Sequence, residues 1–116
     1  MALPWDVRTR AELDLRQYCE KRVPDRVRHQ VRLEFEIRGL NVTLVERRVP
    51  WRPRSSDEPW TRLAVARFRY DPDSACWALD WRDRNERWRP YDRQPTAALG
   101  ELLAEVDADP TAIFWG

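Results

Sequence analysis

The sequence predicts an α+β protein in which a five-stranded antiparallel meander sheet carries an N-terminal and a C-terminal helix on one face. Three features of the 116-residue chain predict this class. Apolar residues recur at helical spacing near each end, apolar and polar residues alternate between them, and short turn sequences separate the alternating segments. We expect a single domain over residues 1–116, because a chain of this length builds one core and no internal repeat divides it.

The first helix is expected over residues 10–22. Thr9 and Glu12 have the spacing of a capping box, which satisfies the free N–H groups of the first helical turn. Residues 11–19 then place their apolar side chains on one stripe. Pro24 ends the helix, because its ring and its missing N–H disrupt a continuing turn.

A β-hairpin is expected from residues 31–38 and 41–48. The first segment alternates perfectly between apolar and charged residues, and Gly39 suits the first central position of a two-residue type II′ turn. That turn fixes the register, and the register has an unusual consequence. Glu46 and Arg48 fall on the apolar face of the hairpin, near its open end.

Three further strands are expected at residues 62–70, 76–83 and 86–92, joined by turns at 71–74 and 84–85. If the second of these turns has two residues, Trp81 lies opposite Trp88 and Asp80 lies opposite Arg89.

The second helix is expected over residues 96–108, with one apolar stripe facing the sheet and a stop at Asp109-Pro110. The final residues, Phe114-Trp115-Gly116, are apolar. We expect them to pack onto the helices or the sheet, and a tail displayed to a partner protein is the alternative.

Composition excludes several function classes. There is no apolar run of 18 or more residues and no recognisable signal peptide, so we expect a cytoplasmic protein without a membrane partner. Cys19 and Cys76 are expected to be small buried hydrophobes, with a disulfide between them left open. With His29 as the single histidine, a zinc site is not expected, and we expect no cofactor.

Tryptophan and arginine are unusually frequent, with seven tryptophans in the chain. Exposed aromatic rings flanked by arginine are the ingredients of a surface that stacks single-stranded nucleic acid. In the alternative interpretation, Trp81 and Trp88 belong to the core and the arginines are solvated or paired with carboxylates. The cluster comprises Arg47, Arg48, Trp51, Arg52, Arg54, Arg82, Arg84, Arg87, Trp88, Arg89 and Tyr91.

Glu46 and Arg48 are a second candidate site. A charged pair on an apolar face is costly unless it is well bonded, so the pair either orients the end of the hairpin or lines a polar pocket for a ligand. The expected walls of such a pocket are Trp51, Trp81 or Trp88.

A third possibility is a hard-cation site for phosphodiester hydrolysis, built from carboxylates of the sheet. The candidates are Glu34, Glu36, Asp80 and Asp83. Lys21 is the only lysine, which leaves no carboxylate–lysine core on the sheet.

Several of these motifs together resemble the bacterial family called domain of unknown function 3024. The resemblance covers nearly the whole chain and depends on four groups of residues. These are Glu46-x-Arg48 leading to Trp51, Trp77 with Trp81-Arg82, Trp88 with Tyr91, and Asp109 to Phe114-Trp115-Gly116. The chain departs from the family pattern at Val49, where proline is frequent, and at Arg89, where histidine is frequent. The resemblance implies one compact unit and no established activity.

The sequence therefore favours a non-catalytic binding module that uses an aromatic and arginine-rich surface to contact a protein or a nucleic acid. A metal-dependent phosphodiester hydrolase is the alternative. We expect the binding surface to centre on Trp51, in a proline-rich loop with no periodic face to bury. The candidate partner-binding residues are Glu46, Arg48, Trp51, Arg82, Asp83, Trp88 and Tyr91.

Overall fold

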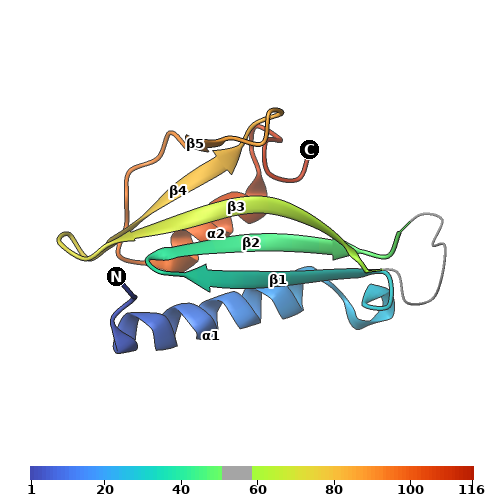
Figure 1. The fold of residues 1–116 in the computed structure, drawn as a ribbon, viewed down its shortest axis with the longest axis horizontal. Helices are drawn as coiled ribbons and strands as arrows, with labels where there is room; N and C mark the ends of the chain where they lie inside the picture. Colours follow the sequence, from blue (N-terminus) through green and yellow to red (C-terminus); the bar gives the residue numbers. More distant parts are fainter. Residues whose placement is uncertain (51–58) are drawn as a thin grey trace.

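The computed structural model describes residues 1–50 and 59–116, and it confirms the α+β class (Figure 1). Each strand pairs antiparallel with the next strand in the sequence, so the five-stranded sheet is the expected meander. The elements are, in order, α1 (Trp5–Arg22), a 3-10 turn η1 (Asp25–Val27), β1 (Val31–Arg38), β2 (Asn41–Arg48), β3 (Thr61–Asp71), β4 (Cys76–Arg82), β5 (Trp88–Pro90) and α2 (Leu99–Ala108).

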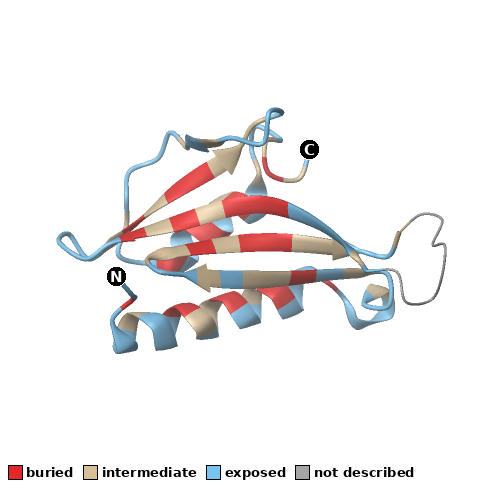
Figure 2. Ribbon diagram, viewed as in Figure 1, coloured by how far each residue is buried: buried red, intermediate tan, exposed pale blue. Residues whose placement is uncertain are grey.

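One hydrophobic core joins both helices to the inward side chains of the sheet. In Figure 1, α2 lies behind the sheet and α1 runs alongside β1, while no helix lies in front of the sheet. Figure 2 shows that the buried residues concentrate in the middle strands and along one side of α1. The core includes Ala11, Leu15 and Cys19 of α1, Leu99, Leu102, Leu103 and Val106 of α2, and Val42, Leu44, Phe68, Trp77 and Leu79 of the sheet.

The β1–β2 hairpin has the predicted register. Leu33 pairs with Glu46 and Val31 pairs with Arg48, as the two-residue turn requires. Gly39 has a φ of +60°, which a side chain rarely adopts. A Cβ atom at Gly39 would also lie 3.1 Å from the carbonyl oxygen of Met1, so both the conformation and the space favour glycine.

A β-bulge interrupts the pairing of β2 with β3. Leu44 pairs with Ala66 while the next residue, Val45, pairs with Ala64, which leaves Val65 as an extra residue on β3. Val65 is 3% exposed and belongs to the core. The bulge therefore inserts one more buried apolar side chain without ending the strand.

Helix α1 begins at Trp5, five residues before the expected start. Pro4 precedes the first turn, and Asp6 supplies the acidic side chain that favours a helix N-terminus. The predicted capping box is wrong. The Thr9 hydroxyl lies inside the helix and donates to the Trp5 carbonyl oxygen at 2.8 Å.

Helix α2 begins at Leu99, not at Thr96. Thr96 instead extends the sheet, because its backbone exchanges two hydrogen bonds with Trp77, of 2.7 and 3.0 Å. Its hydroxyl accepts a hydrogen bond from the Ala98 N–H at 3.1 Å. The backbone hydrogen bonds to Trp77 therefore keep Thr96 out of the helix, which begins about one turn later in the sequence.

The predicted register of the last two strands is wrong by one residue. Arg89 pairs with Trp81, and Trp88 pairs with Arg82. The connecting turn is longer than two residues, because the Asp83 N–H donates to the Arg87 carbonyl oxygen at 2.9 Å before β5 begins. Trp88 consequently lies on the same face of the sheet as Arg82, away from the core.

The C-terminal segment is held by the side chain of Asp109, which ends α2 in a left-handed conformation. Its carboxylate accepts hydrogen bonds from the N–H groups of Ile113, Phe114 and Trp115, at 2.9 to 3.1 Å. Phe114 is 6% exposed, and the Trp115 indole donates to the carbonyl oxygen of Val106 at 3.0 Å. The tail packs as core, as expected.

Cys19 is buried, Cys76 is partly exposed, and both are free thiols. Within the described ranges, no helix combines the length and the apolar character needed to cross a membrane.

Candidate functional site

The sheet face opposite the core carries a concentration of arginines. We call it the open face. The strand registers place seven arginines and three carboxylates there, a formal balance of +4, compared with +1 for the whole chain. The open face comprises Arg32, Glu34, Glu36, Arg38, Asn41, Thr43, Val45, Arg47, Arg62, Ala64, Arg67, Arg69, Ala78, Asp80, Arg82, Trp88 and Pro90.

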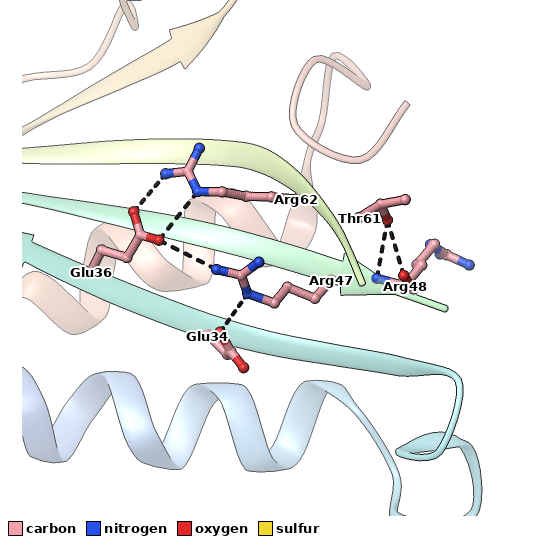
Figure 3. Close-up of polar contacts among 6 residues, drawn as sticks. All are labelled: Glu34, Glu36, Arg47, Arg48, Thr61 and Arg62. Atoms are coloured by element: carbon pink, nitrogen blue, oxygen red, sulfur yellow. Dashed lines mark hydrogen bonds and ion pairs between the residues drawn. The ribbon is translucent and has the colours of Figure 1, made fainter. Parts of the chain in front are cut away.

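Ion pairs cross the first three strands of the open face (Figure 3). Arg47 Nε lies 2.8 Å from Glu34, and its Nη2 lies 3.7 Å from Glu36. Arg62 binds Glu36 through two nitrogens, at 2.5 and 3.2 Å, and this hydrogen bonding lowers the pKa of the Glu36 carboxyl. Val45 is fully buried on this face although neither α1 nor α2 covers it, because long charged side chains can shield apolar surface with their stems.

Asp80 is the only charged residue buried among the described residues, with 1% exposure. It accepts hydrogen bonds from Arg67 Nε at 2.8 Å and from Arg69 Nε at 2.7 Å, and a third from Arg69 Nη2 at 3.0 Å. A buried carboxylate is tolerated only when it is paired and hydrogen-bonded. Asp80 therefore fixes the positions of two arginines on the open face.

Two tryptophans on this side of the sheet are covered by guanidinium groups. The Cζ atoms of Arg67 and Arg82 lie 5.1 and 5.2 Å from the centroid of the Trp88 ring. Trp60, just before β3, has the Arg32 Cζ atom 4.3 Å above its ring. Both indoles are partly exposed. These distances are those of cation–π contacts.

A hollow of about 600 Å³ lies on the open face. It brings Trp88 of β5 together with residues of β1, β2 and β3. Its lining is polar and basic, and comprises Glu36, Ile37, Arg38, Asn41, Thr43, Arg62, Arg67 and Trp88. The open face is therefore concave around the Trp88 ring.

Glu46 and Arg48 lie elsewhere, in a pocket of about 240 Å³ on the core side of the hairpin end. They form an ion pair of 2.8 Å, in which the Glu46 side chain is 15% exposed and that of Arg48 is 60% exposed. The hydrogen bond from Arg48 to Glu46 raises the pKa of the guanidinium. The expectation that Trp81 or Trp88 walls this pocket is wrong, because the tryptophan that lines it is Trp115, whose ring centroid lies 4.3 Å from the Arg22 Cζ atom.

Asp83 and Tyr91 stabilise the chain around β5. The Asp83 carboxylate accepts hydrogen bonds from the backbone N–H groups of Asn85 and Arg87, at 2.8 and 3.0 Å, and forms an ion pair with Arg89 at 2.9 Å. The hydrogen bond from the Arg87 backbone N–H is the main cause of the lowered pKa of Asp83.

The Tyr91 hydroxyl donates to Glu105 of α2 at 3.1 Å, and its ring packs 5.3 Å from that of Phe114. Burial and this hydrogen bond raise the pKa of Tyr91. Trp51, the last of the predicted site residues, lies outside the described residues.

A family model matches residues 4–116, which is almost the entire chain. The chain belongs to the family described as Domain of unknown function (DUF3024). The expected family is thus confirmed. Comparison with curated proteins and with solved structures gives no match.

The residues that suggested DUF3024 have different structural roles in this chain. Trp77 is 3% exposed in the core, whereas Trp88 lies on the open face. Asp109 and Phe114 attach the tail to α2. Glu46 lies in the separate pocket at the hairpin end.

The predicted site residues do not include five arginines of the open face or the adjacent Trp60. These arginines are Arg32, Arg38, Arg62, Arg67 and Arg69. A signal for two of them was present, because Arg67 and Arg69 are two positions apart on a strand and therefore share a face. Asp80 was expected opposite Arg89, but it lies opposite Pro90 and binds Arg67 and Arg69.

The carboxylates proposed for a hydrolytic metal site are bound by arginines. Glu34 contacts Arg47, Asp80 contacts Arg67 and Arg69, and Asp83 contacts Arg89. Within residues 1–50 and 59–116, no three His, Cys, Asp or Glu side chains are grouped closely enough to hold a metal ion.

Proposed function

We propose that this protein is a non-catalytic binding module and that the open face of its sheet binds a polyanionic partner. The observation that carries the proposal is the separation of charge: a chain of net charge +1 places a balance of +4 on one sheet face, which neither α1 nor α2 covers. Arginine from both halves of the chain contributes, including Arg32 and Arg47 from the first half and Arg67 and Arg82 from the second.

The arginines differ in their availability to a partner. Arg47, Arg62, Arg67 and Arg69 are in ion pairs with the carboxylates of the face. Arg32, Arg38 and Arg82 form no ion pair with any residue of the described ranges. These three can bind an anionic group without breaking an existing pair, whereas the paired arginines add to the local positive potential.

A binding role agrees better with this surface than the hydrolase alternative does. A hydrolytic site would need carboxylates free to hold a cation. Asp80 and Asp83 instead accept hydrogen bonds from arginines and from backbone N–H groups. Their oxygens position the arginines and the β4–β5 turn.

Heparin affinity tests the proposal without assuming the natural partner. The double substitution Arg38→Gln and Arg82→Gln removes two charges from the open face. The control, Arg10→Gln with Arg16→Gln, removes the same number from α1. We expect heparin to bind the wild-type protein with a dissociation constant that rises with salt, and to bind the open-face variant about tenfold more weakly. Equal affinities for the two double variants would disprove the assignment to the open face.

A further inference from the structure

The aromatic part of the open face indicates a particular class of polyanion. The positive charge of the open face alone would bind a nucleic-acid duplex, an acidic protein or a sulfated polysaccharide equally well. The Trp88 ring, with two guanidinium groups within 5.2 Å of its centroid, adds a flat apolar surface to the basic region, from the edge strand β5. A second such unit, formed by Trp60 and Arg32, lies at the start of β3.

We infer that the open face binds single-stranded nucleic acid, with an unpaired base stacked at Trp88 and the flanking phosphates bound by arginines. This inference rests on the proposed function and names the partner of the same surface. Indole and guanidinium planes stack on nucleobases of any sequence, and sheet faces with exposed aromatic residues use this contact to bind single strands.

The two arginines over Trp88 have different constraints. Arg67 is held by Asp80 at 2.8 Å, so it keeps its position beside the ring. Arg82 has no carboxylate partner among the described residues, so it can rotate from the ring onto a phosphate without breaking an ion pair. The motion would open the ring for a base while it adds a phosphate contact. Asp80 is therefore a positioning residue, and Trp88 and Arg82 are the contact residues.

The shape of the surface favours a single strand over a duplex. The Trp88 ring borders a hollow of about 600 Å³ on a concave part of the sheet. A base can enter this hollow and stack on the ring only if it is not already stacked within a helix. In a duplex the flat faces of the bases are covered by their neighbours, so the ring would have nothing to stack on.

The structure also supplies a matched control for the ring. Trp5 is 81% exposed at the start of α1 and does not belong to the open face. Substitutions at Trp5 and Trp88 therefore each remove one indole from the protein, and only one of them alters the open face. Trp88→Phe retains a ring for stacking and separates loss of an aromatic surface from loss of volume.

The experiment measures the binding of a fluorescein-labelled 12-mer of deoxythymidylate, a 12-base-pair DNA duplex and heparin to four proteins. These are the wild type, Trp88→Ala, Trp88→Phe and Trp5→Ala, each first checked for an unchanged thermal transition. We expect Trp88→Ala to weaken binding of the 12-mer about tenfold and to leave heparin binding unchanged. We expect Trp88→Phe and Trp5→Ala to bind the 12-mer within about twofold of the wild type.

Different failures lead to different conclusions. If the duplex binds as tightly as the 12-mer, or if Trp88→Ala affects neither nucleic acid, the inference is wrong while the polyanion-binding function stands. If the 12-mer, the duplex and heparin all fail to bind the wild-type protein, the proposed function is wrong as well. If Trp88→Ala loses its thermal transition, the binding measurements use Trp88→Phe and Arg82→Gln in its place. Wild-type affinity for the 12-mer in Arg82→Gln would then overturn the inference.

Discussion

Arg69 holds the buried carboxylate of Asp80 through two parallel hydrogen bonds, from Nε to Oδ2 at 2.7 Å and from Nη2 to Oδ1 at 3.0 Å. Arg67 adds a third bond. We therefore expect Asp80→Asn to lower the free energy of unfolding by about 3 kcal/mol, because the substitution leaves two arginines without their counter-charge. Glu36→Gln, at a half-exposed pair, is expected to cost less than about 1 kcal/mol.

Urea denaturation of the two variants measures this difference. Similar midpoints would show that Asp80 is less important to the fold than its burial suggests. The bidentate bond from Arg69 to Asp80 also raises the pKa of the Arg69 guanidinium, so this arginine stays protonated at alkaline pH.

The tryptophans should divide into two classes of stability effect. Trp77→Ala removes an indole that is 3% exposed in the core, and we expect a loss of about 3 to 5 kcal/mol. Trp88→Ala removes a partly exposed ring on the open face, and we expect a loss of about 1 kcal/mol. Thermal unfolding followed by circular dichroism distinguishes the two. A large loss in the Trp88 variant would contradict its placement outside the core.

Asp109 should be essential to the C-terminal segment. Asp109→Ala removes the acceptor of three backbone hydrogen bonds and puts alanine at a φ of +42°, so we expect a loss of about 2 to 3 kcal/mol. Asp109→Asn is the matched control, because asparagine tolerates this backbone conformation and retains one acceptor oxygen. Urea denaturation gives the ranking. Equal losses in the two variants would indicate that the carboxylate oxygens are not what secures the tail.

Alkaline pH should destabilise the protein through Cys19. Burial raises the pKa of this thiol from 9.0 to about 12, so the folded protein keeps a proton that the unfolded chain releases. The stabilisation is complete below pH 9 and is lost as the pH rises toward 12, at about 1.4 kcal/mol per pH unit. Burial also raises the pKa of the neighbouring Tyr18, which adds to the effect above pH 10.

The test compares the urea stability of the wild type and Cys19→Ala at pH 8 and pH 10.5. We expect the wild type to lose about 2 kcal/mol more than the variant over this interval. Parallel losses would assign the alkaline instability to other groups.

Local patterns predicted the parts of the fold in which short-range chemistry decides the structure. In the first hairpin, strict alternation and Gly39 determine the register, and the structure has that register. The Asp109 stop and the buried stripe of α2 were predictable for the same reason.

Hydrogen bonds that the local patterns do not reveal decided the features that were predicted wrongly. The β4–β5 turn depends on how Asp83 bonds to residues up to Arg87, and one extra position moved Trp88 to the opposite face. The local sequence predicts a helix start at Thr96, but the backbone of this residue pairs with Trp77, nearly twenty positions earlier. The sequence therefore predicted which residue types form the candidate surface, namely tryptophan and arginine. It did not predict where in the fold that surface lies.

The bulge on β3 determines how positive charge is distributed between the two faces of the sheet. Arg62 and Arg67 are separated by an odd number of positions, so a regular strand would point them in opposite directions. The extra residue, Val65, compensates for this mismatch and brings both side chains to the same side. A regular strand that kept Val65 in the pairing would turn Arg62 toward the helices. The bulge at Val65 thus keeps the basic surface in one piece.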